Sequence, residues 1–255
     1  MRVPAESFPP HAGGVDPFWH HDTIMAGGVE VHVGFTSVRA GNLSPNYGQP
    51  GEAAWNIAAL ESSMRVDPGS LRLLRQVHSD QVCDAAADPA DAGPPTGDAW
   101  ICHGGGQSLA IRVADCLPVM MLGRGKNGIT TAGAHAGRPG LLAGVLERTV
   151  ERLREQGAED ITAWIGPSAC GRCYEIPESM VAQIAAERPT LRSRTRWGTT
   201  ALDLRAEARL VLERLGADTI DLGGCTLEDE TLFSHRRSQA EGIQEGRFAG
   251  LIWCR

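Results

Sequence analysis

Three residues of metal-ligating type, His78, Cys116 and His135, stand where β-type runs of the sequence end. His78 follows the first run, Cys116 lies between two others, and His135 closes the last; these runs span residues 71–77, 108–113, 117–122 and 129–134. Loops at the ends of strands carry much of the chemistry of rigid scaffolds. Two imidazoles and one thiolate suffice for a catalytic zinc whose fourth position is open to water or substrate. The spacing also leaves a simpler interpretation open, in which each residue is an ordinary core or surface side chain.

The spacing of the other histidines, glycines and cysteines argues against several kinds of active site. None of the eight histidines is followed two residues later by glutamate, as the zinc deaminase signature requires. No H-x-H pair occurs, which argues against a blue-copper or multicopper site. His103-Gly-Gly-Gly resembles the oxyanion loop of some hydrolases, but no G-x-S-x-G elbow follows it. Cys170-Gly-Arg-Cys173 is a C-x-x-C without a second such pair, so a zinc knuckle and a redox pair remain alternatives to two packing thiols.

Strands and helices must position these residues, and the sequence predicts both in mixed order. Strands are predicted at 29–36, 71–77, 100–102, 108–113, 117–122, 129–134, 161–165 and 248–253. Helices are predicted at 52–64, 139–155, 178–187 and 205–215, and a Pro/Asp/Gly loop at 86–97. Because the order is not a strict βαβ alternation, we expect an α+β fold with mixed β-sheets in a single domain.

Length, charge and cysteine content narrow the class of protein. At about 150 residues per domain, 255 residues suffice for one large domain, which we place at 29–255 after a loose, Pro/Gly/His-rich N-terminal arm at 1–28. The net charge of −7 argues against nucleic-acid and anionic-membrane partners. Seven cysteines, an odd number, without an export signal or an 18-residue apolar run, predict a cytoplasmic protein with reduced thiols.

The blocks Gln76-Val-His, Arg112-Val-Ala-Asp-Cys-Leu-Pro-Val and His135-Ala-Gly resemble the YfiH-like family, also called polyphenol oxidase or laccase-domain proteins. Further blocks that match are Gly34-Phe-Thr-Ser, Gly166-Pro, Cys173-Tyr-Glu, Leu202-Asp-Leu, Cys225-Thr, Phe233-Ser-His-Arg-Arg and Gly246-Arg-Phe-Ala. The resemblance implies an α/β/β/α sandwich with a zinc ion held by two histidines and one cysteine. By motif match, those ligands are His78, Cys116 and His135.

The resemblance also implies an activity. Members of the family are characterised as zinc-dependent purine nucleoside phosphorylases acting on adenosine, inosine or methylthioadenosine, and some also deaminate adenosine. On this basis we expect a purine nucleoside and phosphate as small-molecule partners, catalytic roles for Cys116 and His135, and a monomer or homodimer. Phosphate would bind near the helix that follows His135, where Arg112 and Arg138 add bidentate donors. Asn42 is a further predicted substrate-binding residue.

Several positions depart from the family pattern and keep alternatives open. Arg138-Pro139 stands where the family has Trp-Arg, and His235 replaces a tyrosine; other departures are Val38 for arginine, Gln49 for aspartate and Ala208 for asparagine. One alternative is a cysteine-dependent amidase or peptidoglycan-precursor editing hydrolase, with Cys116 as nucleophile and His135 as base. Another is a catalytically diverged paralogue that binds a metal or nucleotide.

Overall fold

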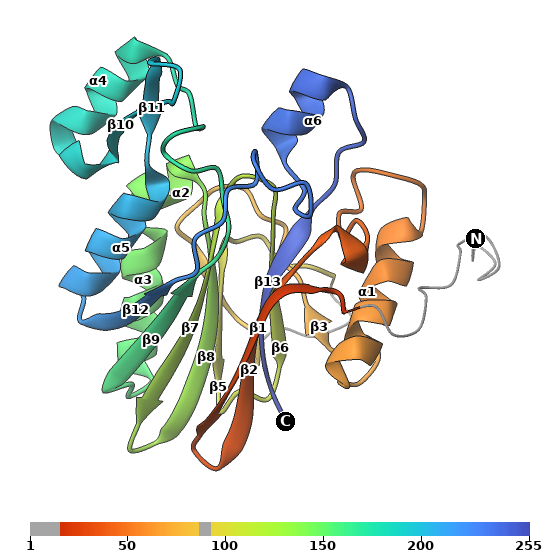
Figure 1. Ribbon diagram of the computed structural model, residues 1–255. Helices are drawn as coiled ribbons and strands as arrows, with labels where there is room; N and C mark the ends of the chain where they lie inside the picture. The colour runs from red at the N-terminus through yellow and green to blue at the C-terminus, as the bar shows by residue number, and fades with distance from the viewer. Residues whose placement is uncertain (1–15, 87–92) are drawn as a thin grey trace.

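Two mixed β-sheets lie face to face in the computed structural model, which describes residues 16–86 and 93–255 (Figure 1). The five-stranded sheet has the order β1 (Phe18–Ala26), β2 (Val29–Thr36), β13 (Phe248–Cys254), β6 (Ser108–Val113), β3 (Leu71–Arg72). The six-stranded sheet has the order β12 (Ala217–Asp221), β9 (Asp160–Ile165), β7 (Leu117–Gly125), β8 (Gly128–Ala136), β5 (Ala99–His103), β4 (Val82–Asp84). The pairs β3–β6, β4–β5 and β9–β12 are parallel, and the other neighbours are antiparallel.

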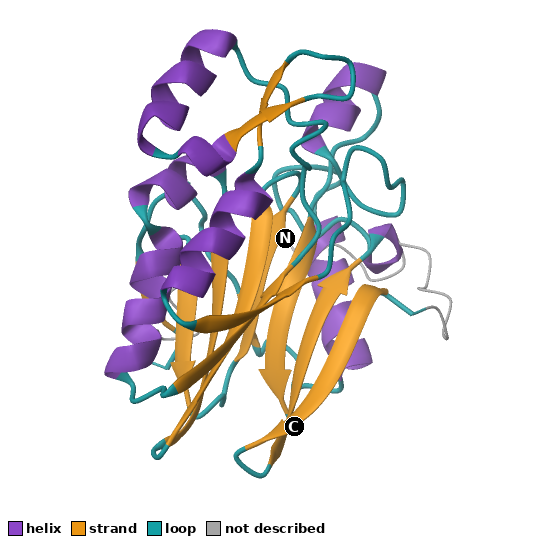
Figure 2. Cartoon of the chain, turned by 60° about the vertical axis from the view of Figure 1, so that its left-hand side comes forward, coloured by secondary structure: helices purple, strands orange, loops and turns teal. Residues whose placement is uncertain are grey.

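Helices cover the outer face of each sheet (Figure 2). Helix α1 (Glu52–Met64) packs Leu60 and Met64 against Leu251 of the five-stranded sheet. The other sheet is covered by α2 (Arg138–Ala143), α3 (Val145–Glu155) and α5 (Leu204–Arg214), while α4 (Glu178–Glu187) packs beside β11 beyond one end of the sheet. Between the sheets, Phe35 and Trp100 belong to one shared core. Four layers around three cores make an α/β/β/α sandwich, which confirms the predicted fold class.

Strand β7 shows why the central strands read as continuous apolar runs. Its residues Leu117, Val119 and Met121 face the helices, while Met120 and Leu122 face the opposite sheet. Successive side chains of a strand point to opposite faces, and here both faces are buried. The two-residue turn at 126–127 joins β7 to β8.

One predicted helix is two helices. The segment 139–155 is divided at Gly144, whose φ of 96° lies in the left-handed region, so that α2 ends there and α3 begins. Glycine adopts this conformation without the steric cost that a Cβ atom brings. The predicted helices at 52–64 and 178–187 are confirmed with the same bounds. Helix α6 (His235–Glu241), the hairpin of β10 (Arg192–Arg194) and β11 (Thr200–Leu202), and 3-10 turns at Val38–Ala40 and Pro189–Leu191 were not predicted.

The expectation of a loose arm at 1–28 is wrong for its last part. Residues Phe18–Ala26 form the edge strand β1, which pairs antiparallel with β2 through a turn at Gly27 and Gly28. An edge strand is paired on one side only, and β1 is partly exposed, so its polar residues obscure the apolar/polar alternation that marks a strand. The Gly-Gly pair was the one sequence signal of a hairpin here. Residues 1–15, and residues 87–92 of the loop predicted at 86–97, lie outside the described residues.

Candidate metal centre

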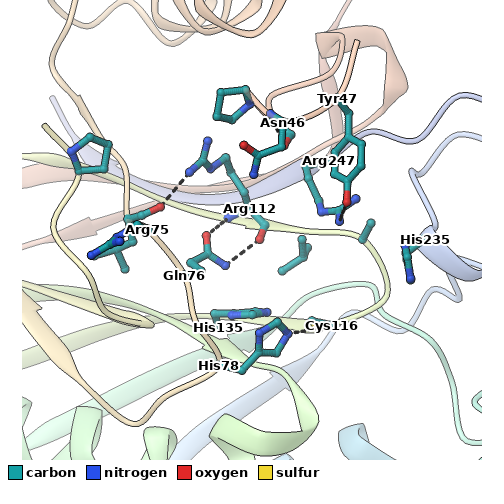
Figure 3. A pocket seen from close by; sticks show the side chains of 16 residues that line it. Asn46, Tyr47, Arg75, Gln76, His78, Arg112, Cys116, His135, His235 and Arg247 are labelled. Carbon is teal, nitrogen blue, oxygen red and sulfur yellow. Dashed lines mark hydrogen bonds between the residues drawn. The ribbon is translucent and has the colours of Figure 1, made fainter.

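The structure brings His78, Cys116 and His135 together from three separate segments. Their ligand atoms all lie within 4.8 Å of one another, and Cys116 Sγ is 3.6 Å from His78 Nε2. The imidazole rings of His78 and His135 meet edge to face, with centroids 4.6 Å apart. Figure 3 shows the three side chains on one side of a pocket. The arrangement has the size and donor types of a single-metal site.

Asp98, which the sequence analysis did not single out, holds two of the three segments in place. Its carboxylate is fully buried and accepts hydrogen bonds from the backbone N–H groups of Val77, His78 and Ser79 at 2.7–3.2 Å. It also lies 2.8 Å from His135 Nδ1. Burial alone raises the pKa of the Asp98 carboxyl, but the hydrogen bonds from His135 and Ser79 keep it well below its usual range. An ionised Asp98 makes His135 Nδ1 the donor, so Nε2 is the nitrogen that faces the site.

The backbone that leads to His78 departs from regular strand geometry. The predicted strand 71–77 is regular only at Leu71–Arg72, because from Arg75 onward the backbone bonds Pro95 and Asp98 instead of a neighbouring strand. His78 itself has a φ of 64°, in the left-handed region. Non-glycine residues in this region are strained and occur often at functional sites.

Cys116 is presented by a second strained residue, Asp115, whose φ is 81°. The Asp115 carboxylate accepts a 2.6 Å hydrogen bond from Thr226 Oγ1 and a 2.7 Å bond from the backbone N–H of Arg236. These bonds fasten the β6–β7 turn to a segment more than a hundred residues away in the sequence. The position of the thiol therefore depends on the C-terminal part of the chain.

Gly137 leaves the space that a bound ion requires. A Cβ atom at this position would lie 2.6 Å from His78 Cδ2, 3.1 Å from Cys116 Sγ and 3.3 Å from His135 Nε2. All three residues of the site thus converge on the face where glycine has no side chain. Two nitrogens, one sulfur and this space fit a zinc ion with an open coordination position.

Electrostatics favour the thiolate form of Cys116. Burial opposes its ionisation, but His135 and His78 lower the pKa of Cys116 to about 6. Burial likewise opposes protonation of His135, and Cys116 with Asp98 raise the pKa of His135 to about 9. The two shifts favour a thiolate at Cys116 and an imidazolium at His135. The thiolate is the form that acts as metal ligand or nucleophile.

A cavity of about 630 Å³ opens from these residues. Figure 3 shows Arg112, Tyr47 and Arg247 on the side opposite the metal-ligating residues. The Arg247 guanidinium stacks on the Tyr47 ring at 4.6 Å and pairs with Glu245 at 2.8 Å. The other residues that line the cavity are Ser44, Pro45, Asn46, Leu74, Arg75, Gln76, Pro94, Val113, Ala114 and His235.

Arg112, a predicted substrate-binding residue, lines the cavity. Its guanidinium bonds the backbone carbonyls of Leu43 at 3.3 Å and Leu74 at 2.8 Å instead of a carboxylate. The Gln76 side-chain amide donates to the Arg112 carbonyl and accepts from the Arg112 N–H. These two bonds hold the end of β6 beside the site. Burial and the nearby Arg247 lower the pKa of Arg112. Two guanidinium groups that face one space make it favourable for an anion.

Two other predicted substrate-binding residues lie outside this lining. Arg138 begins α2 and its guanidinium contacts the Met180 sulfur, so it is absent from the described cavity wall. Asn42 is buried, and its amide bonds the Tyr47 carbonyl at 2.7 Å and the Arg247 N–H at 3.0 Å. Asn42 thus positions two cavity residues without reaching the cavity itself. Arg247 and His235, which do line it, occur in sequence blocks that carried the family resemblance but no assigned role.

The fold and the His–Cys–His site together define a member of a known family. A family model described as multi-copper polyphenol oxidoreductase laccase matches residues 26–255, and the chain belongs to this family. A purine nucleoside phosphorylase of Streptomyces coelicolor is 40% identical over 235 residues, covering 87% of this chain and 95% of the relative. A purine nucleoside phosphorylase of Mycobacterium bovis is 37% identical over 216 residues, covering 83% of this chain and 84% of the relative.

Solved structures share the fold. A crystal structure of a Neisseria meningitidis protein has a TM-score of 0.72 at 29% identity, covering 91% of this chain and 98% of the other. YlmD from Geobacillus stearothermophilus has a TM-score of 0.74 at 25% identity, covering 88% of this chain and 92% of the other. Within the described ranges, no helix has both the length and the apolar character needed to cross a membrane.

Proposed function

We propose that this protein is a zinc-dependent purine nucleoside phosphorylase that uses phosphate to release a purine base from a nucleoside such as adenosine, inosine or methylthioadenosine. Relatives that carry this name are 33–40% identical to the chain over most of its length. The observation that carries the proposal is the placement of His78, Cys116 and His135 at one wall of a cavity whose opposite wall presents Arg112 and Arg247.

The proposed metal is zinc on the chemistry of its donors. Two imidazoles and one thiolate match a catalytic zinc site, and the Asp98 hydrogen bond orients His135 as carboxylates orient zinc-bound histidines. Bound there, zinc would supply a Lewis acid that polarises an oxygen or nitrogen of the substrate.

The reaction assigns tasks to this chain's own residues. Arg247 and Arg112 bind phosphate and orient one of its oxygens toward the ribose C1′ atom. That oxygen forms the new bond to C1′ while the glycosidic C1′–N bond breaks. The electron pair of the broken bond leaves with the purine, which takes up the proton that hydrogen phosphate gives up. Leu74, Val113 and Ala114 offer the purine an apolar wall in the cavity.

A second candidate function is a cysteine-dependent hydrolase, which one observation favours. Cys116, His135 and Asp98 form a chain in which Cys116 contacts His135 and His135 Nδ1 lies 2.8 Å from Asp98. This is the nucleophile–base–carboxylate order of thiol hydrolases. Cys116 would attack a carbonyl carbon of an amide and release the amine, and water would then hydrolyse the thioester.

Phosphorolysis by the purified protein tests the proposal. We expect adenosine, inosine or methylthioadenosine to yield free purine and ribose 1-phosphate (or the methylthio analogue) only when phosphate is present. Chelation should abolish the activity, and zinc should restore it. Cys116→Ala should lose both the activity and about one zinc ion per chain. Cys254→Ser, at a half-buried cysteine on β13, is the matched control and should retain both.

The rival functions give different results in the same assays. An amidase activity that survives chelation and is abolished by iodoacetamide would establish the cysteine hydrolase and overturn the phosphorylase. Zinc binding without any phosphorolysis would identify a metal-binding paralogue, and restoring the family pattern by Arg138→Trp with Pro139→Arg then tests whether divergence removed the activity. Conversion of adenosine to inosine without phosphate would reveal deamination by the same site.

A further inference from the structure

A second group of ligating residues lies outside the proposed active site. Cys170, Cys173, Cys225 and Glu228 place their sulfur and carboxylate atoms within 4.8 Å of one another. The C-x-x-C motif had no second C-x-x-C in the sequence, because its counterpart is the C-x-x-E motif Cys225-Thr-Leu-Glu228. All three thiols are free.

The two motifs meet because β9 and β12 are parallel neighbours. Each motif follows one of these strands, so both loops leave the sheet at the same edge. An isolated parallel bridge between Ser168 and Cys225 continues the pairing beyond the strands. Thr226 N–H bonds the Ser168 carbonyl at 3.2 Å. The adjacency is therefore built into the sheet and does not depend on a chance approach of surface loops.

The two loops also have the same local geometry. The Cys170 carbonyl accepts hydrogen bonds from the N–H groups three and four residues later, both at 2.9 Å. The Cys225 carbonyl accepts the equivalent pair, at 3.0 and 2.9 Å. In each loop the N–H two residues after the cysteine, that of Arg172 or Leu227, is directed at the cysteine sulfur. Backbone donors aimed at the sulfurs of two matched turns stabilise thiolates that share a cation.

The spacing fits one metal ion. At a Zn–S bond length of about 2.3 Å, two sulfurs of a tetrahedral site lie about 3.8 Å apart. The 4.8 Å upper limit among the four donor atoms is compatible with that value once the ion draws them in. The four ligands of an iron–sulfur cluster span longer distances as a set, because they bind different irons of the cluster. Three sulfurs and one carboxylate oxygen complete a tetrahedral set.

Glu228 is the only carboxylate of the set, and a residue outside the set holds its position. Arg196 pairs with Glu228 Oε1 at 2.7 Å, and the Cys173 thiol donates to the same oxygen at 3.5 Å. When a cation displaces the thiol protons, Arg196 offsets part of the negative charge that three thiolates and a carboxylate bring to the site.

We propose that Cys170, Cys173, Cys225 and Glu228 form a second, structural zinc site that clamps the loop after β9 to the loop after β12. The clamp supports the position of Cys116. Ala169 N–H bonds the Asp115 carbonyl at 2.9 Å from one loop, and Thr226 Oγ1 bonds the Asp115 carboxylate at 2.6 Å from the other. The residue before Cys116 is thus held by the immediate neighbours of Cys170 and Cys225. This site does not depend on the proposed catalytic function.

Metal analysis of the full-length protein tests the second site separately from the first. In the Cys116→Ala background, which removes a ligand of the first site, we expect about one zinc ion per chain to remain. Adding Cys173→Ser or Cys225→Ser should remove that ion, while adding Cys254→Ser should leave it bound. A zinc-free Cys116→Ala protein, or zinc retained after both cluster substitutions, would overturn the proposal.

Cobalt(II) provides a second, spectroscopic readout of the cluster. Loaded into the Cys116→Ala protein, it should give the visible bands of tetrahedral coordination and near-ultraviolet thiolate charge-transfer bands. Glu228→Gln should shift the visible bands and keep the charge-transfer bands, because all three thiolates remain. Two results would contradict the site. One is octahedral cobalt without thiolate bands, and the other is a disulfide among these cysteines in protein purified under reducing conditions.

Discussion

Asp98 Oδ1 lies 2.8 Å from His135 Nδ1, and both side chains are almost completely buried. The same carboxylate accepts hydrogen bonds from the backbone N–H groups of Val77, His78 and Ser79. One buried acid therefore orients one histidine of the site through its ring and the other through its backbone. Both histidines depend on a residue that itself makes no contact with the cavity.

Substitution Asp98→Asn should weaken metal binding while preserving side-chain shape. The asparagine amide would present an NH₂ group to the backbone N–H groups and to His135 Nδ1, which all need an acceptor. The negative charge that sets the His135 tautomer would also be lost. We expect zinc affinity to fall about 10- to 100-fold, with a stability loss of about 1–3 kcal/mol. Competition with a chromophoric chelator and urea denaturation measure the two effects. Asp218→Asn, at an exposed position on β12, is the control, and equal zinc affinity in both variants would contradict the role of Asp98.

Gly137→Ala should damage the site without straining the backbone. The φ of Gly137 is −64°, which alanine adopts freely, but its Cβ would lie 2.6 Å from His78 Cδ2. We expect loss of the first zinc ion and of activity, measured by metal content and turnover. Gly106→Ala is the matched control, because a Cβ atom at that position would meet no atom within 4 Å. It should retain zinc and change stability by about 1 kcal/mol or less. Zinc bound normally by Gly137→Ala would show that the space is not needed.

Arg247→Gln should weaken phosphate binding selectively. The substitution removes a guanidinium that faces the cavity from its stacked position on Tyr47. The loss of one charged hydrogen-bonding group corresponds to about a 10-fold or greater rise in the phosphate KM, with a smaller effect on the nucleoside KM. Arg209→Gln, which breaks an exposed ion pair with Glu213, should alter neither constant. A rise confined to the nucleoside KM would place phosphate elsewhere.

Glu245 should contribute stability that is lost in acid. Burial raises its pKa, but Arg247, His235 and Tyr47 together lower the pKa of Glu245 to about 2, from an ordinary value of 4.5. The folded state therefore binds fewer protons than the unfolded state between these two values. The stabilisation is complete above about pH 4.5 and disappears as the pH falls through about 2. Urea denaturation of wild type and Glu245→Gln should show a stability difference that shrinks over this range; a constant difference would rule out titration of Glu245 as its source.

The sequence alone located several strands and helices from their local patterns. Residues 29–36 and 108–113 were predicted as strands and 52–64 and 178–187 as helices, with the bounds that the structure shows. Local periodicity carries this information because each side chain's environment follows from its own element. The predicted helix across Gly144 and the missed edge strand β1 show its limit, since a break or an exposed edge leaves little periodic signal.

The sequence by itself also determined which residues could do chemistry, through the types of His78, Cys116 and His135 and their positions at strand ends. Only the tertiary structure decided what surrounds them. Asp98 joins His78 to His135, and Arg247 lines the cavity whereas Arg138 does not. Glu228 supplies the fourth donor atom of the second cluster, which a second C-x-x-C motif would not have revealed. The physical reason is that ligand geometry and hydrogen-bond partners depend on which strands are neighbours, and strand pairing is a property of the folded sheet.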